Sequence, residues 1–161
     1  MTTLFIRHDN LSDPRIEAFM QEHLRDMYAA SPPESVHALD MNKLRQPGIL
    51  FYSAWDALDA PPEATLLATG ALKLLDEAGH GEIKSMRTHA QRRGQGLAGQ
   101  MLLHILNQAR ARGLQRVSLE TGTQDFFAPA RQLYLRHGFV PCEPFADYQP
   151  DPYSAFFTLA L

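Results

Sequence analysis

The 161-residue sequence is poor in the features that mark secreted and membrane-spanning proteins. Its single cysteine, Cys142, has no second cysteine with which to form an intramolecular disulfide. No stretch approaches the roughly 18 consecutive apolar residues of a spanning helix. The short apolar start is interrupted by Arg7 and His8, unlike the start of a signal peptide. We therefore expect a cytoplasmic protein without a membrane partner.

The sequence also lacks an excess of positive charge. It has 15 Lys and Arg residues against 18 Asp and Glu residues, which gives a formal net charge of −3. A general nucleic-acid binder carries a basic excess, so no nucleic-acid partner is expected. The seven histidines are scattered without the spacing of metal ligands, and we expect no bound metal.

The composition is that of an ordinary globular protein, with 45% hydrophobic and 20% charged residues. The length is close to the commonest size of one domain, so residues 1–161 are expected to form a single domain. No internal repeat and no low-complexity linker divides the chain.

Helical patterns dominate the first part of the chain, after a short apolar strand at Leu4–Ile6. Apolar residues recur at three- and four-residue spacing after the candidate N-cap Asp13, which predicts a helix over about 14–28. Ser31 to Glu34 has the spacing of a capping box, which predicts a second, shorter helix over about 32–44.

The pattern then changes to β-type segments separated by turns, which predicts an antiparallel meander over Ile49–Trp55, Thr65–Leu75 and Glu82–Thr88. Beyond it, helices alternate with strands, which indicates a right-handed crossover and parallel pairing. The expected elements there are a helix over about 95–112, a strand at Arg116–Glu120, a helix over about 127–137, a strand from Phe139 and a last strand at Tyr153–Leu161. The fold class is therefore α/β (α+β), with a mixed, mainly antiparallel sheet of six to seven strands flanked by about four helices.

The most informative segment runs from Glu82 to Gly99, where a strand passes through a basic, glycine-bearing turn into an amphipathic helix. The first N–H groups of a helix are unpaired and carry partial positive charge, and glycines let a ligand approach the backbone. Arg92 and Arg93 add cationic character. The turn therefore predicts an anion site that suits a phosphate, although a solvated basic face is the plain alternative.

Part of this turn also matches a dinucleotide-binding pattern. Gly94, Gly96 and Gly99 have the G-x-G-x-x-G spacing, and Glu120 follows near the place of a ribose-binding acid. Against this hypothesis, five residues separate the strand from the glycines, and too little chain follows to complete a doubly wound sheet. An NAD-binding oxidoreductase module is therefore the weaker alternative.

Two motifs in this chain resemble those of the GNAT N-acetyltransferase superfamily. The segment from Gln91 to Gly96 resembles the family's acyl-CoA loop, Gln/Arg-x-x-Gly-x-Gly/Ala, which lies between the fourth strand and the next helix. The segment from Tyr134 to Phe139 resembles the family's Tyr-x-x-x-Gly-Phe, at the end of the helix after the fifth strand. The likeness covers the core from about Gly48 to Phe139 and is closest to small stand-alone bacterial members.

The resemblance implies an enzyme that moves an acetyl group from acetyl-CoA to a primary amine by direct attack. The acceptor would be a small molecule or, less often, a protein. The implied sheet splays between its fourth and fifth strands and holds acetyl-CoA in the gap. A non-catalytic acyl-CoA-binding regulatory module is the alternative from a different class.

The resemblance also implies which residues hold acetyl-CoA. The strand edge at Met86, Arg87 and Thr88 would pair with the pantetheine arm and point an N–H at the thioester oxygen. Such a fixed donor acts like an oxyanion hole, worth roughly 3 kcal/mol. The pyrophosphate would contact the backbone N–H groups of Gln91, Arg92, Arg93, Gly94, Gln95 and Gly96.

Three side chains are candidates for catalysis. Tyr134 is the candidate general acid, because the family places a phenol near the thioester sulfur; an ordinary core aromatic is the plain alternative. Glu82 and Glu120 are the candidate bases, because each lies on a strand beside the acyl-CoA loop. Glu82 could instead pair with Lys84 or Arg87, Glu120 could cap the loop Thr121–Gln124 at the end of its strand, and some family members need no dedicated base.

Strand alternation gives the expected orientation of these side chains. It places Glu82, Lys84 and Met86 on one face and Ile83, Ser85 and Arg87 on the other.

The acceptor pocket carries the weakest signal in the sequence. Aromatic candidates for its lining, most of them expected in the core, are Tyr28, Phe51, Trp55, Tyr148 and Tyr153. Acidic residues on the first helices, such as Glu22, Asp26 and Glu34, hint at a cationic amine, although a solvated helix face explains them equally well. A homodimer is plausible through a strand edge at the C-terminal end.

Overall fold

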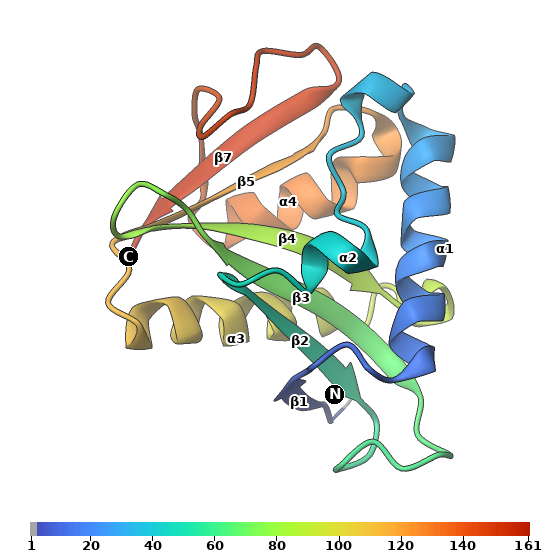
Figure 1. Ribbon diagram of the computed structural model, residues 1–161. Helices are drawn as coiled ribbons and strands as arrows, with labels where there is room; N and C mark the ends of the chain where they lie inside the picture. Colours follow the sequence, from blue (N-terminus) through green and yellow to red (C-terminus); the bar gives the residue numbers. More distant parts are fainter. Residues whose placement is uncertain (1–2) are drawn as a thin grey trace.

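The β-type segments form one seven-stranded sheet in the computed structural model, which describes residues 3–161 (Figure 1). Met1 and Thr2, where the expected domain begins, lie outside the described residues. The strands are β1 (Phe5–His8), β2 (Ile49–Trp55), β3 (Leu66–Leu74), β4 (His80–Thr88), β5 (Arg116–Gly122), β6 (Val140–Pro141) and β7 (Ser154–Ala160). They lie in the order β1-β2-β3-β4-β5-β7-β6. The mixed, mainly antiparallel sheet is thus confirmed.

The strand pairing settles the choice between the two nucleotide-type interpretations. β2, β3 and β4 form the expected antiparallel meander, and β4 with β5 is the only parallel pair among the described strands. A doubly wound dinucleotide-binding fold needs a mostly parallel sheet. The NAD-binding interpretation of Gly94–Gly99 is therefore wrong.

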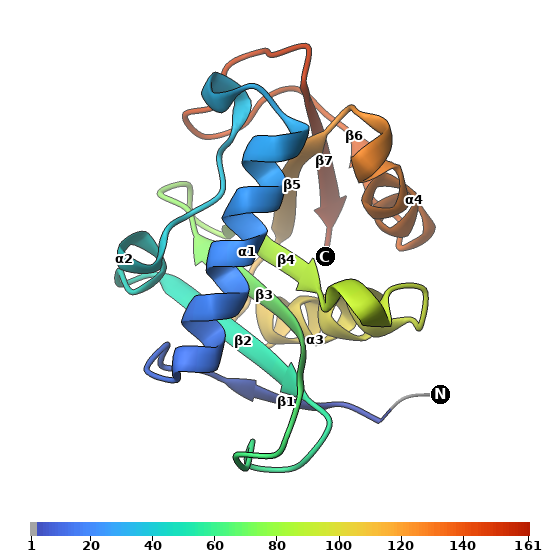
Figure 2. The same cartoon turned by 90° about the vertical axis from the view of Figure 1, so that its right-hand side faces the viewer.

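Helices cover both faces of the sheet (Figure 2). They are α1 (Pro14–Ala30), α2 (Met41–Leu44), α3 (Leu97–Ala111) and α4 (Ala128–Arg136), with 3-10 turns at Pro33–Ser35, Ala90–Arg92 and Asp125–Phe127. Apolar residues of α1 and α2 pack with Phe51 and Trp55 of β2, whereas those of α3 and α4 pack with Ile83 and Val117 of β4 and β5. Each face of the sheet therefore has its own apolar core. Among residues 3–161, no helix is long and apolar enough to cross a membrane.

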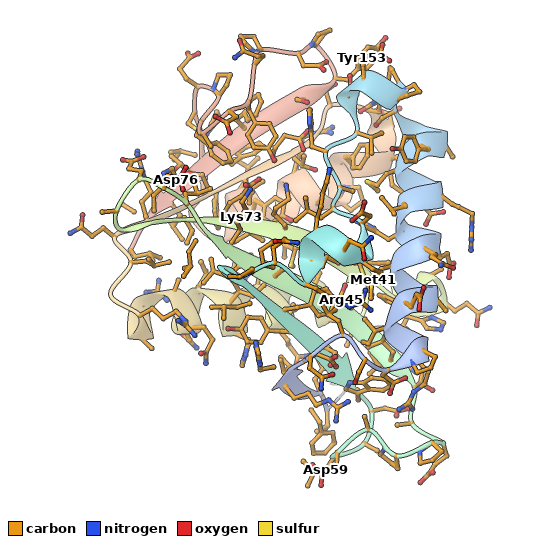
Figure 3. The ribbon with its side chains drawn as sticks, in the orientation of Figure 1. Met41, Arg45, Asp59, Lys73, Asp76 and Tyr153 are labelled. Atoms are coloured by element: carbon orange, nitrogen blue, oxygen red, sulfur yellow. The ribbon has the colours of Figure 1, made fainter. Side chains whose placement is uncertain are left out.

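The expected helix over about 32–44 is wrong. Its proposed N-cap, Ser31, instead ends α1, because its N–H donates to the carbonyl of Met27 over 3.0 Å. A 3-10 turn follows at Pro33–Ser35, and residues 36–40 have no regular secondary structure before α2 begins at Met41, with Asp40 as its N-cap (Figure 3). The serine hydroxyl of Ser35 donates to Asp151 over 2.7 Å, so a contact distant in sequence holds this segment out of a helix.

The sheet splays between β4 and β5, as expected. The two strands pair only over His80–Glu82 and Arg116–Ser118, and beyond these residues they diverge (Figure 1). The edge of β4 that faces β5 therefore has unpaired backbone groups over its second half, which a ligand can bind. The turn into α3 follows directly after this edge.

Candidate active site

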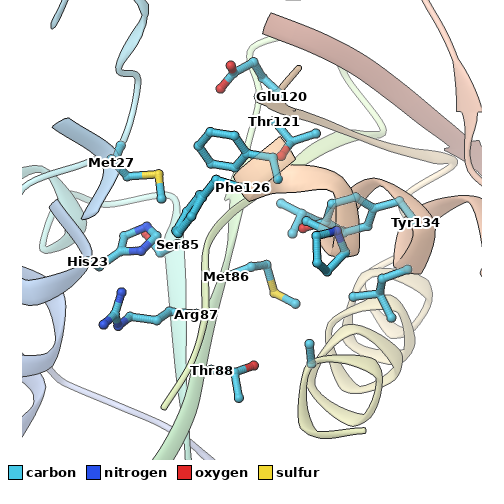
Figure 4. Close-up of a pocket in the computed structure, with 18 of the residues that line it drawn as sticks. His23, Met27, Ser85, Met86, Arg87, Thr88, Glu120, Thr121, Phe126 and Tyr134 are labelled. Carbon is cyan, nitrogen blue, oxygen red and sulfur yellow. The ribbon is translucent and has the colours of Figure 1, made fainter. Parts of the chain in front are cut away.

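The gap between β4 and β5 opens into a cavity of about 580 Å³ (Figure 4). Its lining comes from α1, the segment 31–38, β4, the turn before α3, β5 and α4. Of the residues expected to bind or act on acetyl-CoA, those that line it are Met86, Arg87, Thr88, Arg93, Gly94, Gly96, Glu120 and Tyr134. The expected residues outside this lining are Glu82, Gln91, Arg92 and Gln95. The structure thus brings together the greater part of the predicted site, although the role of each residue stays a prediction.

A bulge in β4 changes the orientation of the strand beside this cavity. Ser85 has a left-handed φ of 57°, and its carbonyl accepts a hydrogen bond from the Thr69 hydroxyl over 2.9 Å. The pairing of β3 with β4 shifts register at the same place. Because one extra residue reverses the alternation, Met86 points to the α3 face and Arg87 to the α1 face. The expectation that Met86 shares a face with Glu82 and Lys84 is wrong for this reason.

Arg87 ties β4 to α1 through its buried side chain. Its guanidinium forms ion pairs with Glu22, over 3.1 Å, and with Asp26, over 2.8 Å. It also lies over the ring of Phe19, 5.2 Å from the centroid. The Arg87 side chain is therefore a bridge to α1, and only its backbone remains for the expected contact with a pantetheine arm.

The turn before α3 exposes its backbone to the cavity. Gly94 and Gly96 have φ values of 79° and 78°, and no atom lies within 4 Å of where a Cβ would stand at either. The N–H groups of Gln91 and Arg92 already donate to the ring Nδ1 and the carbonyl of His89. The glycine half of the expected loop is thus better placed to receive an anion than its first two residues.

Glu82 is buried, with 2% of its surface exposed, in a cluster of three side chains. Its Oε2 accepts hydrogen bonds from the Tyr148 hydroxyl, over 2.5 Å, and from the Lys84 ammonium, over 3.1 Å. Lys84 also donates to the Tyr148 hydroxyl over 2.9 Å. The alternative that Glu82 pairs with Lys84 is confirmed, but the pair is buried rather than solvated.

Glu120 lies within β5 and lines the 580 Å³ cavity. In the sheet it pairs with Phe156 of β7, and the alternative that its side chain caps the loop after the strand stays a prediction. None of the ion pairs found among residues 3–161 involves it. Burial raises the pKa of Glu120 to about 7, because the charged carboxylate loses water in this position. A carboxyl with such a pKa can accept a proton near neutral pH.

Tyr134 belongs to the apolar core and also lines the cavity, and its role as general acid stays a prediction. Its ring packs in the core of α3 and α4, with an edge-on contact to Phe139 at 5.7 Å between centroids. The residue also lines the cavity, opposite β4 (Figure 4). Burial, and secondly the charge of Glu120, raise the pKa of the Tyr134 hydroxyl, so it stays protonated and available as a donor.

Sequence reasoning missed a second cavity, of about 640 Å³, that adjoins the first. His37 and Lys84 line both cavities, and Tyr148 and Glu82 line the second. The ring of His37 packs edge-on against Tyr148 at 5.1 Å between centroids. Tyr148 had been considered only as an aromatic of the acceptor pocket, and no local pattern links it to β4, which lies more than sixty residues earlier.

The remaining candidates fall into the core, onto the surface, or onto the rim of the cavity. Phe51 and Trp55 are buried, Tyr28 is exposed, and Tyr153 lines the 580 Å³ cavity while 43% of its surface is exposed. Among residues 3–161, no group of three or more His, Cys, Asp or Glu side chains is arranged to hold a metal ion.

Comparison with known proteins places the chain among acetyltransferases. The profile of the acetyltransferase (GNAT) family matches residues 16–139. Uncharacterized N-acetyltransferase YedL of Escherichia coli is 49% identical over 156 residues, which cover 97% of this chain and 94% of that protein. A Klebsiella pneumoniae structure described as an acyl-CoA N-acyltransferase matches 100% of this chain and 99% of its own, with a TM-score of 0.76 and 25% identity. PaiA N-acetyltransferase of Thermoplasma acidophilum, solved with coenzyme A, has the same fold, with a TM-score of 0.70 and 15% identity over 99% of each chain.

Proposed function

Because the chain belongs to the GNAT acetyltransferase family, we propose that it moves an acetyl group from acetyl-CoA to a primary amine of a small molecule by direct attack. One observation carries the proposal: a single cavity joins the glycine turn before α3 to the gap between β4 and β5. Acetyl-CoA would fit with its phosphates at the turn and its thioester in the gap. The PaiA structure, solved with coenzyme A, supports this choice of cosubstrate.

The turn would hold the pyrophosphate through backbone groups. The first N–H groups of α3 have no partner within the helix, and together with the helix dipole they favour a negative charge. Because Gly94 and Gly96 have no side chains and open space beside them, a phosphate can approach the backbone closely. Arg93, which also lines the cavity, adds positive charge at this end.

The edge of β4 would hold the pantetheine arm and the thioester. Met86, Arg87 and Thr88 have no strand partner on the β5 side, so their backbone groups can pair with amide groups of the arm. A backbone N–H directed at the thioester oxygen would stabilise the negative charge that develops there, by roughly 3 kcal/mol.

Glu120 is the better of the two candidate bases on geometry. Glu120 lines the cavity that would hold the thioester, whereas the Glu82 carboxylate accepts hydrogen bonds from Tyr148 and Lys84. An alkylammonium has a pKa near that of lysine, about 10.4, so a base is needed to produce the neutral amine at pH 7. Glu120, directly or through one water, would take this proton.

Tyr134 would serve the leaving thiolate. A thiol has a reference pKa of about 8.5, and the Tyr134 hydroxyl stays protonated well above that pH. Its hydroxyl would therefore donate a hydrogen bond to the sulfur as the carbon–sulfur bond breaks, and the thiolate would then take up a proton. Overall, a carbon–nitrogen bond forms, the thioester bond breaks, and an alkylammonium plus acetyl-CoA become an N-acetylamide, free coenzyme A and one proton.

Two measurements test this function against the regulatory-module alternative. Calorimetric titration is expected to show coenzyme A binding in the micromolar range and no heat with NAD. Release of free thiol from acetyl-CoA in the presence of primary amines is expected to exceed the rate without them. Tight coenzyme A binding with no amine-dependent thiol release would favour a non-catalytic module. The cytoplasmic location and the homodimer stay predictions.

A further inference from the structure

The lining of the cavity away from α3 includes three large apolar or aromatic side chains, Met27, Phe126 and Tyr153, among polar ones. Met27 of α1 lies across the cavity from Phe126, which belongs to the 3-10 turn before α4 (Figure 4). Phe126 and Tyr153 line the cavity while 46% and 43% of their surfaces are exposed. Large aromatic groups left exposed at the wall of a cavity are typical of a site that binds an apolar ligand.

Few carboxyl groups line the 580 Å³ cavity itself. Glu120 is the only carboxyl in the lining of the 580 Å³ cavity among residues 3–161. Glu22 and Asp26, whose position on the first helix hinted at a cationic acceptor, form ion pairs with Arg87 instead. The neighbouring cavity of about 640 Å³ is lined by the acidic residues Glu34, Glu82, Asp147 and Asp151 and by the basic residues Lys43, Lys73 and Lys84, so its negative charge is largely balanced. The site therefore offers a place for one ammonium group and not for several.

The basic side chains around the site occupy the nearby carboxylates as ion-pair partners and leave none of these for an acceptor: Lys84 pairs with Glu82, Arg87 with Glu22 and Asp26, and Arg93 with Asp26 at 3.9 Å. Lys84, Arg87 and Arg93 all line the cavity, and Arg93 lies over the Phe126 ring, 5.9 Å from its centroid. Burial lowers the pKa of His23 to about 4 and also lowers that of His37, so both imidazoles are neutral at pH 7. These two rings add neither a cation nor a carboxylate for a charged acceptor to meet.

We propose that the acceptor is a primary monoamine with an uncharged aromatic or bulky apolar body, which lies between Met27 and Phe126 while its nitrogen faces Glu120. This inference rests on the proposed acetyl transfer and names the substrate class of that site. The single ammonium gives its proton to Glu120, and the free amine then attacks the thioester to form an N-arylalkyl acetamide and coenzyme A. Polyamines and lysine-rich peptides are poor acceptors, because the described lining of the 580 Å³ cavity offers their additional charges no carboxyl besides Glu120.

An amine panel tests the acceptor class directly. Thiol release from acetyl-CoA is measured with phenethylamine, ethylamine, spermidine and a lysine-containing peptide at equal concentrations. Burial of the ring is expected to give phenethylamine a kcat/KM at least about tenfold above that of ethylamine. Spermidine and the peptide are expected to fall below phenethylamine by a similar factor or more.

Substitution of Phe126 tests whether its ring binds the acceptor, and substitution of an exposed residue outside the cavity is the matched control. Phe126→Ala is expected to raise KM for phenethylamine about tenfold and to leave KM for ethylamine and the coenzyme A Kd within about twofold. Leu103→Ala is the control, because Leu103 lies on α3, is 50% exposed and lines neither cavity. A thermal melt of each variant shows whether its fold is retained.

The outcomes distinguish a wrong acceptor class from a wrong reaction. Faster turnover of spermidine than of phenethylamine, or an equal effect of Phe126→Ala on phenethylamine and ethylamine, overturns the acceptor class and leaves acetyl transfer standing. Absence of coenzyme A binding, or binding without acetylation of any amine, overturns the proposed function itself and the acceptor class with it.

Discussion

The Tyr148 hydroxyl donates a hydrogen bond to Glu82 over 2.5 Å, and this contact joins β4 to the loop before β7. Lys84 completes the cluster, because its ammonium donates to the Glu82 carboxylate and to the Tyr148 hydroxyl. Burial, and secondly the Glu82 charge, raise the pKa of the tyrosine, so it remains a donor. The buried Glu82 carboxylate would lose its compensating charge without Lys84, and would lose a hydrogen bond without Tyr148. We therefore assign Glu82 a structural role beside the cavity and not the role of base.

Tyr148→Phe is expected to destabilise the protein. Removing the hydroxyl leaves Glu82 with Lys84 alone, and the loss of a hydrogen bond to a buried charge costs about 1–3 kcal/mol. Urea denaturation followed by circular dichroism measures the change in the free energy of unfolding. Tyr28→Phe is the control, because Tyr28 is 55% exposed and is expected to change stability by less than about 0.5 kcal/mol. Equal stability of the two variants would remove the structural role from the cluster.

The two candidate bases can be separated by their glutamine variants. Glu120→Gln is expected to lower kcat by about 10²-fold or more, the usual contribution of a general base. In the native enzyme, kcat/KM is expected to rise with pH up to an apparent pKa near 7, because Glu120 must be ionised to accept the proton. Glu82→Gln, compared as folded protein, is expected to retain kcat within about tenfold. A larger loss for Glu82→Gln than for Glu120→Gln would reverse the assignment.

Tyr134→Phe is expected to slow transfer and to leave coenzyme A binding nearly unchanged. The ring, which packs against Phe139, stays in place, and only the hydroxyl that faces the cavity is removed. We expect kcat to fall about 10²-fold, while the coenzyme A Kd measured by calorimetry changes by less than about twofold. Full activity in this variant would show that Tyr134 is an ordinary core aromatic.

The glycine turn can be tested against a second glycine of the same conformation. Gly94 and Gly48 have φ values of 79° and 87°. At either position, a Cβ would have no atom of a non-adjacent residue within 4 Å. Valine at either position strains the backbone by roughly 1–2 kcal/mol, so both variants should lose similar stability. Only Gly94→Val is expected to weaken coenzyme A binding, by about tenfold, which corresponds to about 1.4 kcal/mol. Equal coenzyme A affinity of the two variants would place the phosphates away from this turn.

Local patterns in the sequence were sufficient to predict most of the fold. The apolar stripe of α3 and the N-cap of α1 at Asp13 depend on residues three or four positions apart, and both are confirmed. The helix expected over 32–44 failed because Ser31 and Ser35 found partners that the local pattern does not contain. The capping-box spacing gave no signal that Ser35 would bond to Asp151.

The position of the candidate site was predictable where it depends on the backbone and on the turn before α3. The glycines before α3 mark an open stretch of backbone, and the structure places Gly94 and Gly96 on the cavity. Side-chain directions on β4 were not predictable, because the bulge at Ser85 reverses the alternation that the sequence implies. The partners of Glu82 and Arg87 depend on α1 and on the loop near β7, which come from distant parts of the chain.

Glu120 is expected to lower the free energy of unfolding as the pH rises above neutral. Replacing it with glutamine is expected to reverse that loss of stability. Its pKa in the fold, about 7, is above the value of 4.5 expected for an unfolded chain, so the fold favours the protonated form. The stability that this carboxyl contributes is complete below about pH 4.5 and is lost as the pH rises through about 7. Glu120→Gln stays uncharged, and its gain over the native protein should grow across this range to on the order of 1–3 kcal/mol. Urea denaturation at about pH 5 and pH 8 measures the difference, with the exposed Glu143→Gln as the control. A gain that is equal at both pH values would show that the pKa of Glu120 is not raised by the fold. Glu120 would then be a weaker candidate for the general base at neutral pH.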